Sequence, residues 1–255
     1  MIDEPASDRA SAELSRPPPA FYAAHPGGWR DWWNLLHVPY TAWHLAYVVI
    51  GASLAPHVDL TRLIASLLAF FFAVGLAAHA LDELRGRPLG TRIPSPVLVT
   101  VSVVALAGAL ALGIAGVSRV GWPLIPFLIV GPCLVIAYNL ELFEGIIHND
   151  VGFAAAWGAF PLLTAYVAQT GRVSIGAGLA TAAAFALACA QRQLSTPARL
   201  VRRRTALVEG HMTLRDGTVL PIDERTILAP LELALRSLSW GLVLLATSLA
   251  VARLG

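Results

Sequence analysis

Long apolar runs separated by short polar stretches dominate the hydrophobic pattern of this chain. Seven of the runs have about the 20 residues that an α-helix needs to cross the hydrocarbon core of a membrane. They extend from Trp33 to Ala55, Leu60 to Leu81, Pro96 to Val117, Trp122 to Leu140, Val151 to Gln169, Val173 to Gln191 and Ile227 to Ala252. The pattern therefore predicts an all-α integral membrane protein with about seven transmembrane helices.

The composition agrees with a membrane location. Of the 255 residues, 56% are hydrophobic and 13% are charged, and the mean hydropathy is +0.67. The formal net charge of +2 is too small to indicate a nucleic-acid partner. Cys133 and Cys189 lie in different apolar runs, so we expect two small buried hydrophobic residues and no disulfide framework.

Two polar regions accompany the predicted transmembrane domain of residues 33–255. Residues 1–32 are expected to form a disordered or amphipathic cytoplasmic tail. Residues 192–226 are the one long predicted loop, and its HMTLRDGTVLPI stretch has two extended runs around Asp216-Gly217, a dipeptide that favours a tight hairpin turn. We interpret this loop as a solvated connector, with a lid over a membrane-edge site as the alternative.

The distribution of arginine predicts the orientation. Basic residues gather after the second and sixth runs, at Arg85, Arg87, Arg92, Arg192, Arg199, Arg202, Arg203, Arg204, Arg215 and Arg225. The opposite loops carry only isolated ones, such as Arg62, Arg119 and Arg172. Because cytoplasmic loops are enriched in Lys and Arg, the N-terminus is expected in the cytoplasm and the C-terminus on the opposite side. A bacterial inner membrane would fit this arrangement.

Ionisable residues in or near membrane spans are functional candidates because such groups are costly in lipid. In the first run, His37 and His44 are seven residues apart, which is close to two helical turns. Pro39 lies between them and could start the helix, so the direction of His37 stays open.

The ends of the second and fourth runs carry further polar clusters. His79, Asp82 and Glu83 stand at i, i+3 and i+4, although Glu83 could instead pair with Arg87 four residues on. Glu141, Glu144 and His148 stand at i, i+3 and i+7, and would share a face if the fourth helix continued past Tyr138. Both runs travel outside to inside, so the sequence predicts that these clusters and the start of the first run meet at one cytoplasmic level.

One stretch resembles a known family. The sequence AAHALDELRGRPLGTRIPSP after the second run is similar to the first signature region of the UbiA superfamily of membrane prenyltransferases. Tyr138-Asn139 and the following GFAAAWGAFPLLTAYVAQTG add to the resemblance, which covers roughly residues 33–192. It implies a helical bundle around a central, lipid-accessible cavity that opens to the cytoplasm.

The chain departs from the family at the residues that bind metal. Of the Asn-Asp-x-x-Asp-x-x-x-Asp motif only Asp82 is kept, with His79 in place of the first aspartate, and no carboxylate lies between Cys189 and Leu200, where a second aspartate-rich motif is expected. Those motifs hold magnesium, which prefers oxygen ligands, whereas imidazole with carboxylate suits iron. We therefore expect a different metal chemistry from that of the family.

The leading hypothesis is a membrane metalloenzyme, with one or two iron ions, that acts oxidatively on a lipid or isoprenoid and needs an electron donor. The expected metal ligands are His37, His44, His79, Asp82, Glu141, Glu144 and His148, with Glu83 and Asp150 orienting them. Substrate contacts are expected from Trp43, Tyr138, Asn139, Trp157, Arg85 and Arg87. The alternatives are a divergent Mg-dependent prenyltransferase and a non-catalytic lipid-binding subunit.

Overall fold

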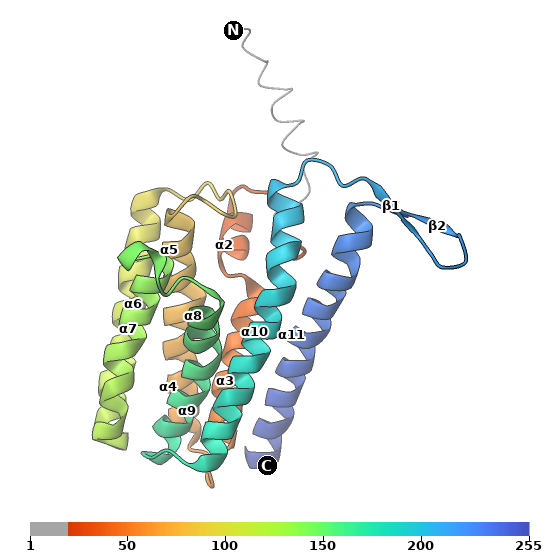
Figure 1. The fold of residues 1–255 in the computed structure, drawn as a ribbon. Helices are drawn as coiled ribbons and strands as arrows, with labels where there is room; N and C mark the ends of the chain where they lie inside the picture. The colour runs from red at the N-terminus through yellow and green to blue at the C-terminus, as the bar shows by residue number, and fades with distance from the viewer. Residues whose placement is uncertain (1–19, 255) are drawn as a thin grey trace.

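The computed structural model describes residues 20–254, which form a bundle of long helices and one small β-hairpin (Figure 1). Residues 1–19, the greater part of the predicted tail, lie outside the described range. Six helical segments are long and apolar enough to cross a membrane: Leu60–Leu84, Ser95–Val120, Trp122–Asn139, Asp150–Thr170, Ile175–Arg204 and Glu224–Leu254. Each coincides with a predicted run, which confirms an all-α membrane protein.

Three of these segments are composite helices. Leu60–Leu84 joins α4 (Leu60–Phe70), η1 (Phe71–Ala78) and α5 (His79–Leu84), and Asp150–Thr170 joins α8 (Asp150–Ala154), η4 (Ala155–Ala159) and α9 (Phe160–Thr170). Trp122–Asn139 joins η2 (Trp122–Leu124) and α7 (Ile125–Asn139). The middle elements η1 and η4 are π-helical, a conformation that often marks functional sites because it shifts side chains and backbone groups out of register.

The first apolar run is divided in two. Helix α2 (Trp29–Leu35) is separated from α3 (Val38–Ser53) by His37, whose backbone is left-handed with φ 44°. Pro39 lies in the first turn of α3, as a proline is expected to at a helix start. Helix α3 has 16 residues, about 24 Å at 1.5 Å per residue, so a seventh membrane span remains a prediction.

Helix α3 nevertheless lies at the centre of the bundle, between α9 and α11 (Glu224–Leu254). Close contact is possible because small residues stand at the crossings: Gly51 of α3 meets the backbone of Leu162, and Gly158 of η4 meets Ala184 of α10 (Ile175–Arg204). The outward faces are apolar. Val103 and Val104 of α6 (Ser95–Val120) are 62% and 65% exposed, which suits contact with lipid.

The two ends of the bundle differ. One end, called here the polar end, contains α2, α5, residues 140–149, the C-terminal part of α10 and the start of α11, while the last turn of α11 lies at the opposite end (Figure 1). Residues 192–204 of the expected loop are not a loop, because α10 continues to Arg204. Polar residues on this part of the helix mark a face that lines a pocket.

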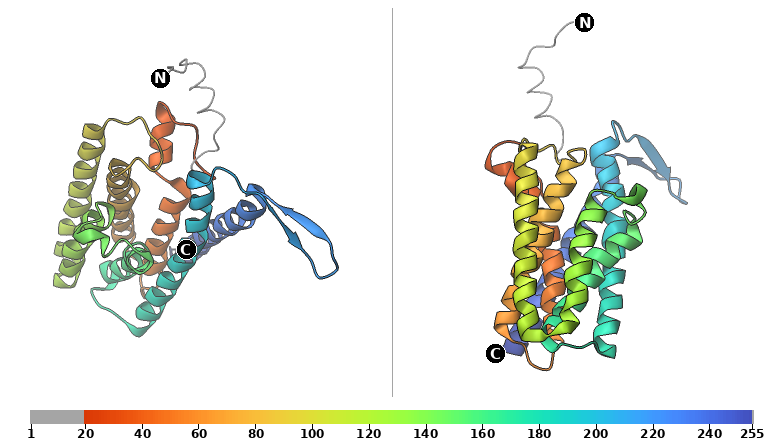
Figure 2. Two further views of the ribbon diagram at one scale, coloured as in Figure 1. Left: turned by 45° about the horizontal axis from the view of Figure 1, so that its top comes forward. Right: turned by 90° about the vertical axis from the view of Figure 1, so that its left-hand side faces the viewer.

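The predicted hairpin is confirmed. Strands β1 (Gly210–Thr213) and β2 (Val219–Ile222) pair antiparallel, and Gly217 in the turn has φ 87°. Glycine favours this conformation because it has no Cβ. The hairpin extends away from the bundle in all the views (Figures 1 and 2).

Candidate functional site

A cavity of about 140 Å³ at the polar end, called here the polar pocket, is lined by polar and ionisable side chains from distant parts of the chain. Its lining comes from residues 20–40, from α3, η1, α5, η4 and α10, and from the end of α7 with the loop that follows. The predicted ligands that line it are His37, His44, His79, Asp82 and His148. The polar pocket thus brings together most of the side chains expected to share one level.

The other three histidines of the pocket have their Nδ1 atoms bound to backbone carbonyls. His44 Nδ1 lies 2.8 Å from the oxygen of Trp157, His79 Nδ1 lies 3.2 Å from that of Gly75, and His148 Nδ1 lies 2.9 Å from that of Tyr138. A carbonyl only accepts hydrogen bonds, so each Nδ1 is the protonated nitrogen and each Nε2 keeps its lone pair. This tautomer is the one that a metal-binding histidine uses when it ligates through Nε2.

The π-helical segments supply two of these carbonyls. Gly75 belongs to η1 and Trp157 to η4, so a carbonyl of each irregular helix fixes one histidine, His79 and His44 respectively. His37 and His79 stack with ring centroids 4.4 Å apart, and His148 stacks on Tyr138 at 4.5 Å.

His37 differs from the other histidines. Its Nδ1 lies 2.6 Å from the Tyr22 hydroxyl, and its Nε2 is buried without a hydrogen-bond partner. Burial raises the pKa of the Tyr22 hydroxyl, which therefore keeps its proton and can either donate to His37 or accept from it. Both tautomers of His37 are thus accommodated.

Tyr22 belongs to the segment expected to be a disordered or amphipathic tail. Residues 20–28 pack on the polar end: the Asn34 side chain pairs with both the N–H and the C=O of Ala24, and Phe21 lies 4.9 Å from the Arg236 guanidinium. The folded part of this segment therefore forms one wall of the polar pocket.

Two of the seven expected ligands lie outside the polar pocket. Helix α7 ends at Asn139, and Glu141, Phe143 and Glu144 have positive φ angles, so the expected common helical face of Glu141, Glu144 and His148 is wrong. Glu141 instead pairs with Arg85 at 2.9 Å, and Glu144, in η3 (Phe143–Gly145), is exposed.

The residues expected to orient the ligands have other partners. Glu83 is fully buried and accepts hydrogen bonds from the backbone N–H groups of Leu89 and Thr91, not from a histidine or Arg87. Asp150 pairs with Arg192 at 2.8 Å. Glu83 therefore holds the loop between α5 and α6, and Asp150 ties α8 to α10.

The expected substrate contacts divide in the same way. Tyr138, Asn139 and Trp157 line the polar pocket. Trp43 does not line it, because it is buried in the bundle, where its indole N–H donates to the Tyr47 hydroxyl at 2.7 Å. Arg85 and Arg87 are bound to backbone carbonyls of Leu140 and of Thr91 and Ile93.

Sequence reasoning missed the basic wall of the polar pocket. Arg192, Arg199 and Arg203 line it from α10, together with Gln191 and Ser195. Their spacing of seven and four residues places them on one helical face, and this periodicity was the available signal.

Among residues 20–254, no group of three or more His, Cys, Asp or Glu side chains is close enough together to form a ready-made metal site. The polar pocket brings candidate ligands to one place without closing them around a single point.

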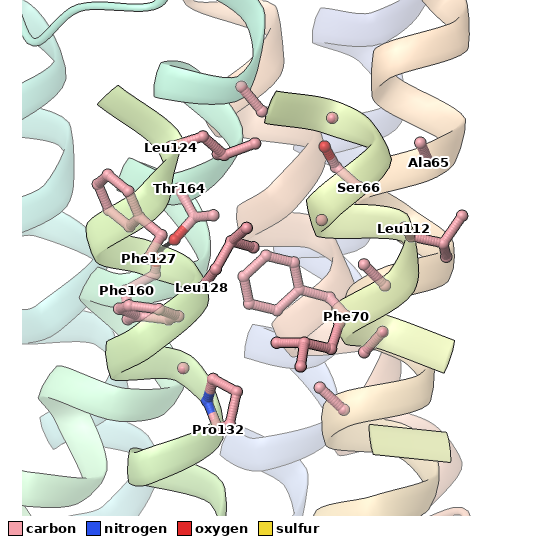
Figure 3. A pocket seen from close by; sticks show the side chains of 18 of the residues that line it. Ala65, Ser66, Phe70, Leu112, Leu124, Phe127, Leu128, Pro132, Phe160 and Thr164 are labelled. Atoms are coloured by element: carbon pink, nitrogen blue, oxygen red, sulfur yellow. Dashed lines mark hydrogen bonds between the residues drawn. The ribbon is translucent and has the colours of Figure 1, made fainter. Parts of the chain in front are cut away.

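A second, larger cavity of about 480 Å³ adjoins the first and is called here the apolar cavity. Phe70, Phe127, Leu128 and Phe160 point into it from α4, α7 and α9 (Figure 3). Val74 of η1 and Trp157 of η4 line both cavities. The two cavities therefore share one lining residue from each π-helical segment.

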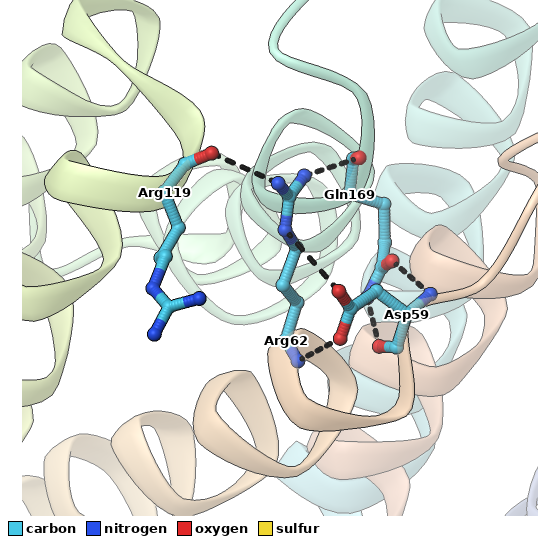
Figure 4. A network of polar contacts seen from close by, with 4 residues as sticks. All are labelled: Asp59, Arg62, Arg119 and Gln169. Carbon is cyan, nitrogen blue, oxygen red and sulfur yellow. Dashed lines mark hydrogen bonds and ion pairs between the residues drawn. The ribbon is translucent and has the colours of Figure 1, made fainter.

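The far end of the apolar cavity lies at the opposite end of the bundle, where Arg62 connects three segments (Figure 4). Its guanidinium donates to the carbonyls of Gln169 at 2.9 Å and Arg119 at 2.8 Å. Asp59 accepts from the backbone N–H of Arg62 at 3.0 Å and forms an ion pair with its side chain at 3.8 Å. From Arg62 to Val74 the cavity follows twelve residues of helix, about 18 Å.

No protein-family model matches this chain, and searches of curated proteins and of solved structures found no similar protein.

Proposed function

We propose that this protein is an integral membrane metalloenzyme that acts on a lipid or isoprenoid chain. The candidate ligands are His37, His44, His79, His148 and Asp82, a smaller set than the sequence suggested. The observation that carries the proposal is that histidines from four segments line one pocket, three of them with Nδ1 held by a carbonyl and Nε2 left to bind. The buried, unpartnered Nε2 of His37 supports it further.

Iron fits this donor set because imidazole and carboxylate together suit it, and it would supply oxidative chemistry such as hydroxylation, desaturation or cleavage. Manganese and zinc accept the same ligands. Bringing three or more donors to one ion requires rotation of side chains. The stacked rings of His37 and His79 already place two imidazoles side by side.

The chain's own residues would position the substrate. An apolar chain in the apolar cavity would pass between Val74 and Trp157 before it reached the histidines. The rings of Phe70, Phe127 and Phe160 surround that path and exclude water from it. This arrangement favours reaction near the polar end of a bound chain.

The Mg-dependent prenyltransferase receives less support. That enzyme would bind magnesium through Asp82, Glu83, Glu141 and Glu144 and the diphosphate through Arg85, Arg87 and Arg92. Of these residues only Asp82 lines the polar pocket. A non-catalytic lipid-binding subunit would use the same cavities without a metal.

Metal analysis of the purified protein tests the proposal. After expression in iron-supplemented medium, we expect about one or two transition-metal ions per chain, and loss of most of that metal in the double variant His44→Gln, His79→Gln. The matched control is His57→Gln with His211→Gln, since both residues are exposed and remote from the pocket. A wild-type protein without bound transition metal would contradict the proposal, as would equal metal content in the two double variants.

A further inference from the structure

The polar pocket has two chemically different walls. One wall carries the histidines and Asp82, from α3, α5 and the neighbouring loops. The facing wall is the inner face of α10, with Arg192, Arg199 and Arg203. A cation is favoured beside the first wall, which offers the Asp82 carboxylate and imidazole lone pairs, and an anion is favoured beside the positively charged guanidinium groups of the second.

Arg199 has no ion-pair partner among residues 20–254. Arg192 pairs with Asp150 at 2.8 Å, outside the pocket lining. Within residues 20–254, the partner of the Arg199 side chain is the Thr196 hydroxyl at 3.5 Å, and no carboxylate forms an ion pair with it. A half-buried guanidinium without a counter-ion is unfavourable, since burial removes its hydration.

Two buried polar groups of the same pocket are also unsatisfied. The Tyr138 hydroxyl and the Gln191 Oε1 atom have no hydrogen-bond partner, although Tyr138 is 5% and Gln191 2% exposed. Both residues line the polar pocket. Buried polar groups are nearly always hydrogen-bonded in proteins, so these two indicate a missing polar ligand.

We infer that Arg199, with Arg192, Arg203, Tyr138 and Gln191, binds the oxyanionic head group of an amphiphile whose apolar chain lies in the apolar cavity. A guanidinium recognises a phosphate or carboxylate through two parallel N–H···O bonds. The Tyr138 hydroxyl can donate to the same oxyanion, and the Gln191 amide can donate through Nε2 and accept through Oε1.

The shared lining of the two cavities explains why the ligand would be an amphiphile and not a free anion. Val74 and Trp157 border both spaces, so a head group at Arg199 and a chain along Phe70 and Phe160 would lie on either side of these two side chains. The oxyanion would then lie next to the candidate metal ligands. The inference rests on the proposed function for its substrate role, but head-group binding is measurable without metal.

The first test measures binding of dodecyl phosphate to the full chain, freed of metal by chelation, in a neutral maltoside detergent. We expect Arg199→Gln to weaken binding by about tenfold to a hundredfold, the usual effect of losing a charge-assisted hydrogen-bond pair. Arg199→Lys, which keeps the charge but loses the fork, should weaken binding less. Circular dichroism and size-exclusion profiles matching the wild type establish that both variants are folded.

The matched control is Arg204→Gln on the same helix, because Arg204 is exposed and does not line the pocket. It should bind dodecyl phosphate as the wild type does, which accounts for partition of the probe into micelles. Equal affinity of Arg199→Gln and Arg204→Gln would overturn the inference. If the wild type bound inorganic phosphate as tightly as dodecyl phosphate, the inference that the ligand is an amphiphile would be overturned.

A second pair of variants tests where the chain lies. Ala109 lines the apolar cavity, whereas Ala107, two residues away on α6, faces outward. Ala109→Phe should weaken the binding of dodecyl phosphate at least tenfold and leave the affinity for butyl phosphate unchanged. Ala107→Phe should change neither affinity. If Ala109→Phe had no effect on the long chain, the apolar cavity would not be its site.

These measurements separate the two proposals. If the purified protein holds no transition metal but Arg199→Gln still weakens the binding of dodecyl phosphate, the metalloenzyme proposal fails and the head-group site stands. If metal is bound and Arg199→Gln keeps full affinity, the head-group site fails alone.

Discussion

At the scale of single residues, Glu83 shows how a carboxylate at a membrane helix end can serve structure alone. It is 0% exposed and accepts hydrogen bonds from the N–H groups of Leu89 at 3.0 Å and Thr91 at 2.8 Å, and from the Thr91 hydroxyl at 2.8 Å. Both oxygens are therefore used as acceptors, which a carboxylate can do and an amide cannot.

Replacement of Glu83 by Gln should lower the free energy of unfolding by about 2 kcal/mol, because the new NH₂ group must face an N–H donor. SDS-induced unfolding in mixed micelles measures the change. The matched control is Glu144→Gln, which alters an exposed carboxylate and should change neither stability nor metal content. Equal stability of the two variants would show that the Glu83 hydrogen bonds are not important.

The spacing of residues predicted the site only where the helix was regular. His79 and Asp82 were expected on one face of a helix end, and both line the polar pocket because α5 continues to Leu84. Glu141 was expected on the same face as His148, but α7 ends at Asn139 and the chain turns through several left-handed residues. Helical periodicity carries no information beyond the residue where the helix ends.

At the scale of elements, close helix packing depends on small residues. A Cβ atom added at Gly51 of α3 would lie 2.1 Å from the backbone oxygen of Leu162 in α9. A backbone atom cannot move aside as the end of a flexible side chain can, so the two helices would have to separate. We expect Gly51→Ala to lower the free energy of unfolding by about 1–3 kcal/mol, measured by the same SDS titration.

The control for Gly51 is Gly241→Ala in α11, where nothing lies within 4 Å of the added Cβ. Alanine has the higher helix propensity, so this variant should be unchanged or slightly more stable. If both variants were destabilised to the same extent, the cause would be the change in the helix backbone and not the contact between α3 and α9.

Deletion of the hairpin tests whether this part of the chain is a solvated connector or a lid over the site. Gly210 pairs with Ile222, so the ends of the excursion are adjacent, and a Gly-Ser-Gly linker can replace residues 211–221. Because the hairpin extends away from the bundle, we expect the shortened protein to keep the metal content and dodecyl phosphate affinity of the full chain. A tenfold loss of that affinity would favour the lid.

Helix limits were predictable where hydropathy changed and not where the helix became amphipathic. The limits of α6 and α11 lie within a few residues of the predicted runs, since both helices are apolar over most of their length. The sixth run was ended at Gln191, whereas α10 continues thirteen residues further, through Pro197. Its inner face is polar there because it lines a pocket, and hydropathy cannot separate such a face from a loop.

At the scale of the whole molecule, arginines are unevenly divided between the two ends. The opposite end has four arginines: Arg62, Arg119, Arg172 and Arg253. The Arg62 side chain and the Arg119 backbone carbonyl belong to the network around Gln169. The polar end holds the larger set that follows α5 and extends along α10 and the hairpin. By the positive-inside rule, the polar pocket should face the cytoplasm.

Cysteine labelling tests both this orientation and the seventh span. Native Cys133 and Cys189 are first replaced by serine, and single cysteines are then placed at the exposed positions Trp29, His57, Arg172 and Asp216. In bacterial spheroplasts, a membrane-impermeant maleimide should label His57→Cys and Arg172→Cys directly. It should label Trp29→Cys and Asp216→Cys only after lysis, because these positions are at the polar end.

The comparison of Trp29→Cys with His57→Cys decides whether α3 crosses the membrane, since α2 and α3 lie between the two positions. Helix α3 is about 6 Å shorter than the hydrocarbon core, a mismatch that the adjoining residues or local thinning of the bilayer must absorb. Its central position between α9 and α11 makes the crossing the favourable arrangement, because its buried His44 would otherwise lose the Trp157 carbonyl of η4. Labelling of both positions from the same side would contradict a seventh span, and labelling of Asp216→Cys in intact spheroplasts would reverse the orientation.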